Sequence, residues 1–187
     1  MKRIDSKKDY ISYLEADRSR LTSDVNFKDV ILRTEKYYTW KYIKCLRKTE
    51  YILNVKKGIF GKFLYAIQLF RLHRLMNKTQ IRIYPNVFGP GLFIPHLGRI
   101  LVSPIAQIGS NCTIRPGVLI GASLGVSNKK LIVNEIGDNV EIAEGCKLLC
   151  RKIGDNVVIG PNTVVLRSVP SDSTVFGNPC EIMPRNI

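Results

Sequence analysis

The sequence predicts a solenoid of short parallel β-strands that follows a small helical domain. Three observations support this fold class. An apolar residue recurs every six positions beyond residue 100, all nine prolines and twelve of the fourteen glycines lie beyond Ile83, and the region before residue 80 contains few residues that interrupt helices. A chain of 187 residues can form one sizeable domain with a smaller appendage. We therefore expect a helical domain over residues 1–82 and a solenoid over residues 83–187.

The first of these regions has the apolar spacing of short helices. The stretch DYISYLEADRSRL and the apolar residues between positions 60 and 76 recur at near-helical intervals. Gly58 and Gly61 are the only glycines before Pro85, and no proline precedes Pro85. Several short helices therefore fit residues 1–82.

The second region has a period of six, which excludes an amphipathic helix with its period of 3.6. Such a period fits a solenoid in which each hexad supplies one strand and one corner, and three hexads close a triangular coil. Glycine, asparagine and aspartate follow many hexad positions, as corners require, and IGDN occurs at 136–139 and again at 153–156. The spacing of sixteen between Ile120 and Ile136 breaks the period, so GASLGVSNKKLIVNE is expected to leave the coil as a loop. The recurring residues are Val102, Ile108, Ile114, Ile120, Ile136, Ile142, Leu148, Ile153, Ile159 and Val165.

The positive charge of the chain is concentrated in one segment. The net charge is +14, yet residues 1–40 and 83–187 each carry nine Lys/Arg against seven Asp/Glu. Residues 41–82 carry eleven Lys/Arg against Glu50 alone, a net charge of +10. This segment could meet anionic lipid headgroups, a nucleotide or nucleic acid, or it could be an ordinary solvated face. We expect peripheral contact with an anionic membrane at its inner face, and no nucleic acid.

Compartment signals favour a cytoplasmic protein. Five irregularly spaced cysteines suggest a reducing environment, and the N-terminal MKRIDSKKDY lacks the apolar core of a signal peptide. The longest apolar stretch, IFGKFLYAIQLF, is about a dozen residues long and contains Lys62, too short and too charged to span a bilayer.

One of only two histidines lies in GPGLFIPHLGRI, just before the periodic region. Taken alone, His96 could be a buried histidine bonded to a backbone carbonyl. However, IYPNVFGPGLFIPHLGRILVSPIAQIGSNCTI, the helical DYISYLEADRSRL and the terminal NTVVLRSVPSDSTVFGNPCEIM resemble the hexapeptide-repeat acyltransferases, which fold as a left-handed parallel β-helix. The chain is most similar to their serine O-acetyltransferase branch, which includes enzymes that O-acetylate bacterial sugars and polysaccharides.

The resemblance implies a mechanism and a set of site residues. His96 would be the general base that activates an acceptor hydroxyl toward acetyl-CoA, in keeping with an imidazole pKa of about 6.5. Backbone N–H groups near Gly98 would stabilise the oxyanion. Acetyl-CoA would lie between the subunits of a homotrimer, which could assemble further through the helical domain, and no metal would be needed. Residues implied for CoA are Gly121, Ala122, Ala143 and Gly160 along the pantetheine, and Arg167 and Arg185 at the phosphates; each glycine could instead simply turn a corner.

Several residues differ from those of the serine O-acetyltransferases, and these differences bear on which acceptor substrate is expected. Aspartates of that branch are matched here by Pro95 and Arg82, and the loop SNKKLIVNE lacks an Arg-His pair that engages the amino acid. Asp17 falls near a substrate-contacting aspartate, while Glu135 or a backbone carbonyl could orient His96. A zwitterionic serine needs a partner for each of its charges, because a buried unpaired charge is costly. This sequence lacks most of those partners, so a sugar or surface-polysaccharide hydroxyl is the expected acceptor.

Two alternatives stay open: a serine O-acetyltransferase of cysteine biosynthesis, and a non-catalytic basic binding module. A zinc hydratase like the γ-class carbonic anhydrases needs three histidines, and the chain has two.

Overall fold

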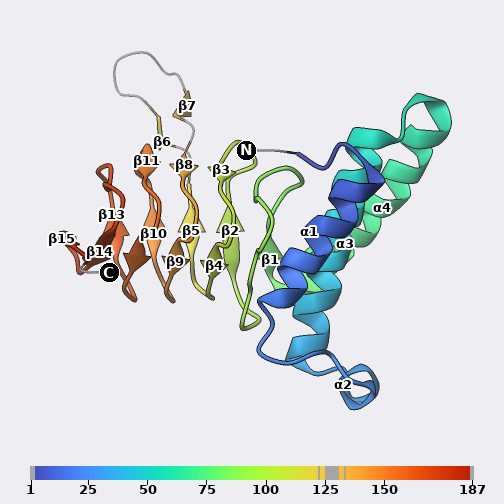
Figure 1. Ribbon diagram of the computed structural model, residues 1–187, viewed down its shortest axis with the longest axis horizontal. Coiled ribbons are helices and arrows are strands. Elements are labelled where there is room, and N and C mark those ends of the chain that lie inside the picture. Colours follow the sequence, from blue (N-terminus) through green and yellow to red (C-terminus); the bar gives the residue numbers. More distant parts are fainter. Residues whose placement is uncertain (1–2, 122, 125–130, 133, 186–187) are drawn as a thin grey trace.

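The computed structural model describes residues 3–121, 123–124, 131–132 and 134–185. The helices of this part of the chain come first: α1 (Lys7–Ser19), α2 (Phe27–Leu32), α3 (Glu35–Val55) and α4 (Gly58–Thr79). They lie against the N-terminal end of an elongated solenoid (Figure 1). Ser6, Asn26 and Thr34 cap α1, α2 and α3, because their side chains accept hydrogen bonds from backbone N–H groups of the first turns. The helical prediction for the first part of the chain is confirmed, but α3 and α4 have 21 and 22 residues and are longer than the short helices expected.

The helical layer is fixed to the solenoid by buried polar contacts as well as apolar ones. Tyr42 of α3 is fully buried, and its hydroxyl donates to the Ile83 carbonyl and accepts from the Ile83 N–H, both at 3.0 Å. The Tyr42 side chain thereby satisfies both the N–H and the carbonyl of Ile83, near the start of the solenoid. Ile43, Leu46 and Leu72 lie in the same apolar core as the first coils.

A buried ionic cluster also joins α1, α3 and the first coil. The Arg47 side chain is fully buried, with Nε 2.8 Å from Asp17 Oδ2 and Nη1 3.0 Å from Glu50 Oε2. It also donates to the carbonyls of Phe88 and Gly89 at 2.9 and 2.6 Å. Burial raises the pKa of Glu50, whereas the two carboxylates outweigh burial and raise the pKa of Arg47. A buried charge is tolerated here because opposite charges and hydrogen bonds surround it.

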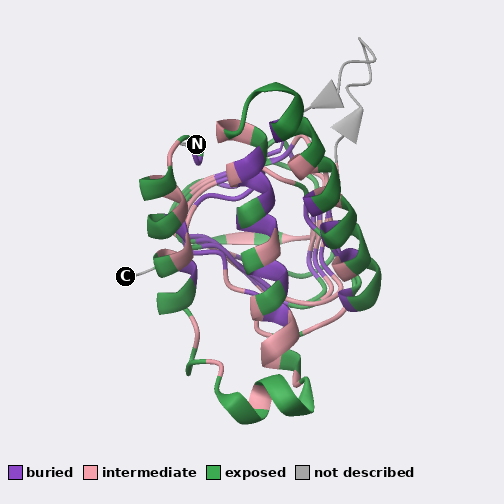
Figure 2. Ribbon diagram, turned by 90° about the vertical axis from the view of Figure 1, so that its right-hand side faces the viewer, coloured by how far each residue is buried: buried purple, intermediate pink, exposed green. Residues whose placement is uncertain are grey.

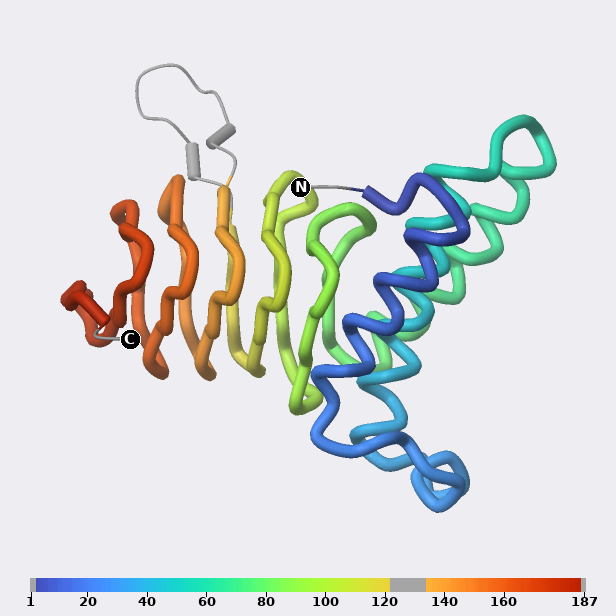
Figure 3. Tube along the Cα trace, in the orientation of Figure 1, coloured from blue at the N-terminus to red at the C-terminus, as the bar shows by residue number. Residues whose placement is uncertain are grey.

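Successive coils of the chain follow one another along the solenoid (Figure 3), and each coil carries short strands. Most of these strands form three facets, which we call A, B and C. Facet A contains β1 (Ile81–Arg82), β2 (Ile100–Val102), β5 (Leu119–Ile120), β10 (Lys147–Leu148) and β13 (Val164–Val165). Facet B contains β3 (Gln107–Ile108), β8 (Glu135–Ile136) and β11 (Lys152–Ile153). Facet C contains β4 (Thr113–Ile114), β9 (Glu141–Ile142), β12 (Val158–Ile159), β14 (Ser173–Phe176) and β15 (Glu181–Pro184).

Neighbouring coils pair in parallel and in hexad register. Leu148 pairs with Ile120 and Val165 in facet A, and Ile142 pairs with Ile114 and Ile159 in facet C. The β14–β15 pair is antiparallel and ends the stack. Seen from the helical end, the strands enclose a three-sided cross-section (Figure 2). Every residue of the predicted period of six is buried, so the triangular coil is confirmed.

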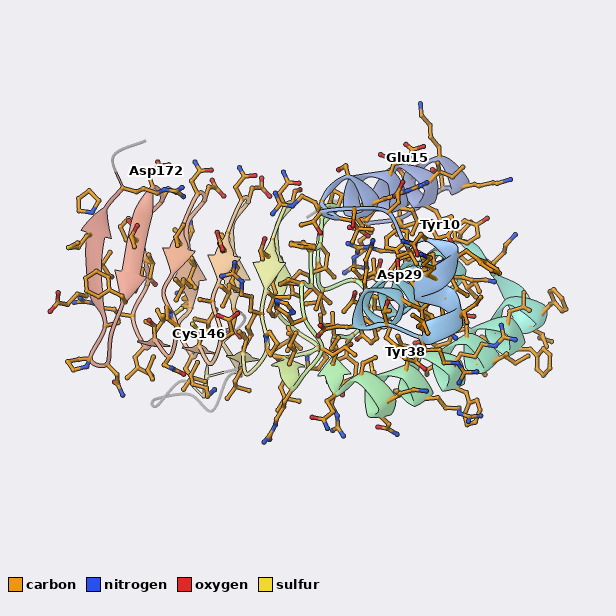
Figure 4. All side chains as sticks on the ribbon, turned by 90° about the horizontal axis from the view of Figure 1, so that it is seen from below. Tyr10, Glu15, Asp29, Tyr38, Cys146 and Asp172 are labelled. Atoms are coloured by element: carbon orange, nitrogen blue, oxygen red, sulfur yellow. The ribbon has the colours of Figure 1, made fainter. Side chains whose placement is uncertain are left out.

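Asparagines line the corner between facets B and C. Asn111, Asn139 and Asn156 all have a positive φ near +57°, as does Asp172. Each asparagine Nδ2 donates to the side-chain oxygen of the next residue in this series, at 3.1, 3.0 and 2.8 Å. Asp172 ends the ladder at the edge of the last coil (Figure 4). Asparagine suits these positions because it tolerates the left-handed conformation and can bond along the stack.

The break in the period falls at one corner, between facets A and B. Strands β5 and β8 belong to adjacent facets, and β6 (Ser123–Leu124) pairs antiparallel with β7 (Leu131–Ile132) between them. Ile108 still pairs with Ile136, so the loop leaves the coil register intact. At the other boundary, β1 already pairs with β2, and the solenoid therefore begins at Ile81, just before the expected residue 83.

Candidate active site

His96 lies at the corner where the chain passes from facet C to facet A. A bridge from Phe93 to Thr113 holds the preceding residues on facet C, and Ile100 begins β2 on facet A. Ile94 and Ile100 are both buried, whereas the His96 side chain is 60% exposed. The expectation that His96 is open to a ligand fits this position, and the buried-histidine alternative does not. We call this edge of the solenoid the C–A corner.

Close stacking fixes the backbone beside His96. Gly98 has φ +144°, and a Cβ on it would lie 2.9 Å from the Pro116 Cβ of the next coil. Glycine is therefore required at this position. The next coil also donates from the Gly117 N–H to the Arg99 carbonyl at 2.7 Å. Contacts with the next coil thus hold the backbone that follows His96, while the imidazole faces solvent.

Helix α3 supplies a carboxylate to His96. Glu35 lies in the first turn of α3, where Thr34 caps the helix. Its Oε2 is 3.3 Å from His96 Nδ1, and its Oε1 accepts a hydrogen bond from the Leu97 N–H. One carboxylate therefore contacts both the imidazole and the adjacent backbone. Sequence reasoning missed Glu35, whose only signal was an acidic residue after a helix cap.

The contact with Glu35 favours one tautomer of His96. An ionised carboxylate only accepts hydrogen bonds, so the proton of the neutral imidazole belongs on Nδ1. This leaves the lone pair on Nε2, which is the nitrogen that can accept a proton from another molecule. Both side chains are exposed, at 60% and 45%, so solvent weakens the interaction.

We expect Glu35→Gln to lower kcat up to about fivefold, because an exposed pair of this kind contributes about 0.2–1 kcal/mol. Glu35 positions His96 and should not contact acetyl-CoA, so KM for acetyl-CoA should stay unchanged while Glu35→Asp restores most of the rate. Steady-state acetyl transfer measures this. Glu15→Gln is the matched control, since Glu15 is an exposed glutamate of α1 (Figure 4). Equal losses in both variants would contradict the positioning role.

Two expected supporting residues are corrected by the structure. Asp17 is fully buried, and its Oδ1 accepts from the N–H groups of Gly91 and Leu92 at 2.8 Å while Arg47 pairs with it. It anchors the start of the solenoid and offers no oxygen to a substrate. Glu135 lies in β8 on facet B, which faces away from the C–A corner, so it cannot orient His96 within one chain.

The residues expected along CoA do not form one column within a single chain. Ala143 and Gly160 follow β9 and β12, so both lie at the C–A corner with His96. They are stacked close to neighbouring coils, with Ala143 N–H donating to Ile159 and Gly160 N–H to Val175. Gly121 instead follows β5 on facet A, at a different corner, where a Cβ would lie 2.8 Å from Leu149 Cδ2. Ala122 lies outside the described residues.

The two arginines expected at the phosphates also lie apart. Arg167 follows β13 on facet A and donates from Nη2 to the Cys180 carbonyl at 3.3 Å. Arg185 follows β15, and its N–H donates to the Asp172 carbonyl at the corner between facets B and C. Both side chains are exposed. They cannot clamp one phosphate together within a single chain.

A basic depression lies where facet A meets the end of α4. Arg82 of β1 and Arg99, three residues after His96, line an open depression of about 340 Å³ together with Gln80 and Leu101. Arg82 stands where the resemblance expects an aspartate, so two guanidinium groups replace a negative charge here. Within the described residues, no group of three or more His, Cys, Asp or Glu side chains could hold a metal ion.

Known proteins resemble this chain in sequence. The serine acetyltransferase of Staphylococcus xylosus is 40% identical over 130 residues, which are 66% of this chain and 59% of the relative. That of Staphylococcus aureus strain N315 is 40% identical over 137 residues, covering 72% and 60%. The chain thus spans about three fifths of the length of these curated relatives. No protein-family profile matches it.

Solved structures resemble it over nearly its whole length. A serine acetyltransferase of Neisseria gonorrhoeae superposes with a TM-score of 0.71 at 22% identity, covering 97% of this chain and 69% of that one. A soybean serine acetyltransferase complexed with serine gives 0.66 at 25% identity, covering 94% and 68%. The chain has the serine acetyltransferase fold. The expected left-handed parallel β-helix behind a helical region is thereby confirmed.

The serine acetyltransferase fold also supports the resemblance to hexapeptide-repeat acyltransferases. A further serine acetyltransferase structure, described as a complex with CoA, has a TM-score of 0.68 and covers 95% of this chain. These relatives and structural neighbours are all serine acetyltransferases, and none of them carries the finer resemblance to sugar and polysaccharide O-acetyltransferases.

Proposed function

We propose that the protein is an acetyl-CoA-dependent O-acetyltransferase with His96 as its general base. The observation that carries the proposal is the outward-facing imidazole whose Nδ1 meets the Glu35 carboxylate at 3.3 Å. Its Nε2 is left to accept the proton of an acceptor hydroxyl, which is a poor nucleophile without a base. The serine acetyltransferase relatives support the same activity.

The proposed reaction needs no group beyond the two substrates. The hydroxyl oxygen attacks the thioester carbonyl as its proton passes to His96 Nε2. The tetrahedral intermediate then breaks its carbon–sulfur bond, and the imidazolium returns the proton to the CoA thiolate. The Gly98 N–H, which meets no acceptor among the described residues, is the proposed oxyanion donor.

L-Serine is the acceptor that the comparisons support, in preference to the sugar hydroxyl expected from the sequence. A zwitterionic acceptor needs partners for both charges. Arg82 and Arg99 supply cations for a carboxylate. A sugar or surface-polysaccharide hydroxyl remains the second candidate, favoured by Pro95 and Arg82 at positions where the resemblance expects aspartates.

Acetyl-CoA is proposed to lie along the C–A corner, past Ala143 and Gly160, in a groove between subunits of a homotrimer. The arginines that lie apart within one chain favour this arrangement, because a phosphate at a subunit boundary can take cations from two chains. A trimer would also cover a flank of each solenoid.

The test is acetyl transfer by the purified 187-residue chain. With acetyl-CoA and L-serine we expect release of the CoA thiol in step with formation of O-acetylserine, identified by mass spectrometry. Free hexoses and N-acetylhexosamines are the comparison acceptors. Faster transfer to a sugar would select the second candidate, and no transfer to any hydroxyl acceptor would overturn the proposed activity.

A further inference from the structure

Helix α4 exposes an apolar stripe that the fold does not use. Ile59 and Phe60 are 88% and 73% exposed, and Phe63, Ile67 and Phe70 are exposed as well. We call these five residues the α4 stripe. Scattered apolar residues on a surface are ordinary, but a contiguous group of large ones marks an interaction site.

The α4 stripe occupies one side of the helix, opposite its buried side. Each residue turns an α-helix by roughly 100°, so Ile59, Phe63 and Phe70 fall within roughly 40° of one another. Phe60 and Ile67 extend the stripe to roughly 100° of arc. The residues that α4 buries against the rest of the protein lie on the other side, and include Gly61, Gln68, Leu72 and Met76. The outward apolar face is therefore not a by-product of core packing.

Positive charges surround the α4 stripe. Between residues 56 and 78 the chain carries six basic residues and no acidic one, and all six are exposed. Within the described residues, none of the six forms an ion pair with a carboxylate. The Arg74 guanidinium lies over the Phe70 ring, 5.9 Å from its centroid, so cationic and apolar groups share one surface. The six are Lys56, Lys57, Lys62, Arg71, Arg74 and Lys78.

We propose that α4 docks the protein onto an anionic lipid bilayer, with the α4 stripe in the interfacial region and the surrounding cations at the headgroups. Helices with one apolar face and basic flanks lie in the plane of a membrane interface. Among the described helices, none has the length and apolar character needed to cross a bilayer. The surface therefore fits a helix that lies on the membrane.

Charge decides between a bilayer and the other occupants of this face. A two-fold contact with a second copy of the chain would bring two acid-free cationic surfaces together, and their repulsion would oppose the apolar contact. Nucleic acid would meet the cations but would gain little from the aliphatic side chains of Ile59 and Ile67. An anionic bilayer complements both the charge and the apolar stripe. This inference does not depend on the proposed acetyl transfer.

The experiment is flotation of the purified 187-residue chain with vesicles of phosphatidylcholine, with and without phosphatidylglycerol. We expect flotation only with phosphatidylglycerol, and at least tenfold weaker binding when the ionic strength is raised about tenfold. Phe60→Ser combined with Phe63→Ser and Phe70→Ser should lower binding at least tenfold. These side chains are exposed, so circular dichroism and the melting temperature should stay close to those of the wild type.

Matched controls separate the contribution of the apolar α4 stripe from that of the surrounding cations. Leu166→Ser with Phe176→Ser removes exposed apolar residues of the solenoid and should leave binding unchanged. Lys56→Gln with Lys57→Gln and Lys62→Gln should weaken binding, whereas Lys7→Gln with Lys8→Gln on α1 should not.

Three results would overturn the proposal. One is absence of flotation at low salt, and another is undiminished binding of the serine triple variant. The third is a smaller assembly of that variant in sedimentation without any vesicle binding by the wild type, which would assign the stripe to a second copy of the chain.

Discussion

Replacing His96 by alanine should lower acetyl-transfer turnover by roughly 10²–10⁴-fold, the range for loss of a general base. The imidazole is the group that would take the hydroxyl proton, and it lies exposed at the C–A corner with Glu35 at its other nitrogen. Because the side chain is exposed, the variant should fold normally and bind acetyl-CoA as the wild type does. Steady-state kinetics and calorimetric titration with CoA measure the two quantities separately.

His73→Ala is the matched control for this prediction. His73 is the other histidine of the chain, and its side chain is exposed on α4. Its replacement should leave turnover unchanged. Wild-type turnover in the His96 variant would place the base elsewhere, whereas a parallel loss of CoA binding would assign His96 to the binding of the co-substrate.

Replacing Arg47 by methionine should destabilise the protein by about 3–5 kcal/mol, the usual cost of removing one partner from a buried ion pair. Asp17 and Glu50 would be left as buried carboxylates, and the carbonyls of Phe88 and Gly89 would lose their donor. Urea unfolding followed by circular dichroism measures the change in the free energy of unfolding. Arg18→Met is the control, because the Arg18–Asp24 pair is exposed and should matter little.

The deficit of the Arg47 variant should shrink in mild acid. Burial raises the folded-state pKa of Glu50 and Arg47 opposes that rise, so removing Arg47 raises the pKa further. A raised carboxyl pKa means that the folded state binds the proton more tightly than the unfolded state. Stability is then fully present below the ordinary glutamate pKa of about 4.3 and is lost as pH rises through the folded-state pKa. A pH-independent deficit would contradict this account.

The solenoid could be predicted because its signal is local and repeated. Each hexad supplies one buried aliphatic residue, and parallel stacking repeats the same requirement coil after coil, so Ile114, Ile142 and Ile159 all obey one rule. The loop after Ile120 also followed from counting. Counting did not show to which facet each strand belongs. Gly121 and Ala143 look equivalent as small residues after a strand, but they follow strands of different facets and therefore lie at different corners.

The partners of the key side chains could not be predicted, because they depend on how the helices dock. Glu35 is 61 residues from His96, and no spacing rule connects a helix cap to a solenoid corner. Arg47 was counted within a basic segment whose charge suggested exposure, yet it is fully buried beside Asp17 and Glu50. A one-dimensional charge count does not distinguish a solvated cation from one enclosed by two helices and a coil.

The asparagine ladder has a direction that its last residue imposes. A carboxylate can only accept, so Asp172 requires Asn156 to present its amide N–H₂ toward it, which turns the Asn156 oxygen toward Asn139. The same constraint passes on to Asn111, and the side-chain dipoles align head to tail over successive coils. In a repeat protein held by nearest-neighbour contacts, the terminal coil is where unravelling begins. The anionic acceptor, which makes the strongest bond of the series, therefore lies where fraying would otherwise start.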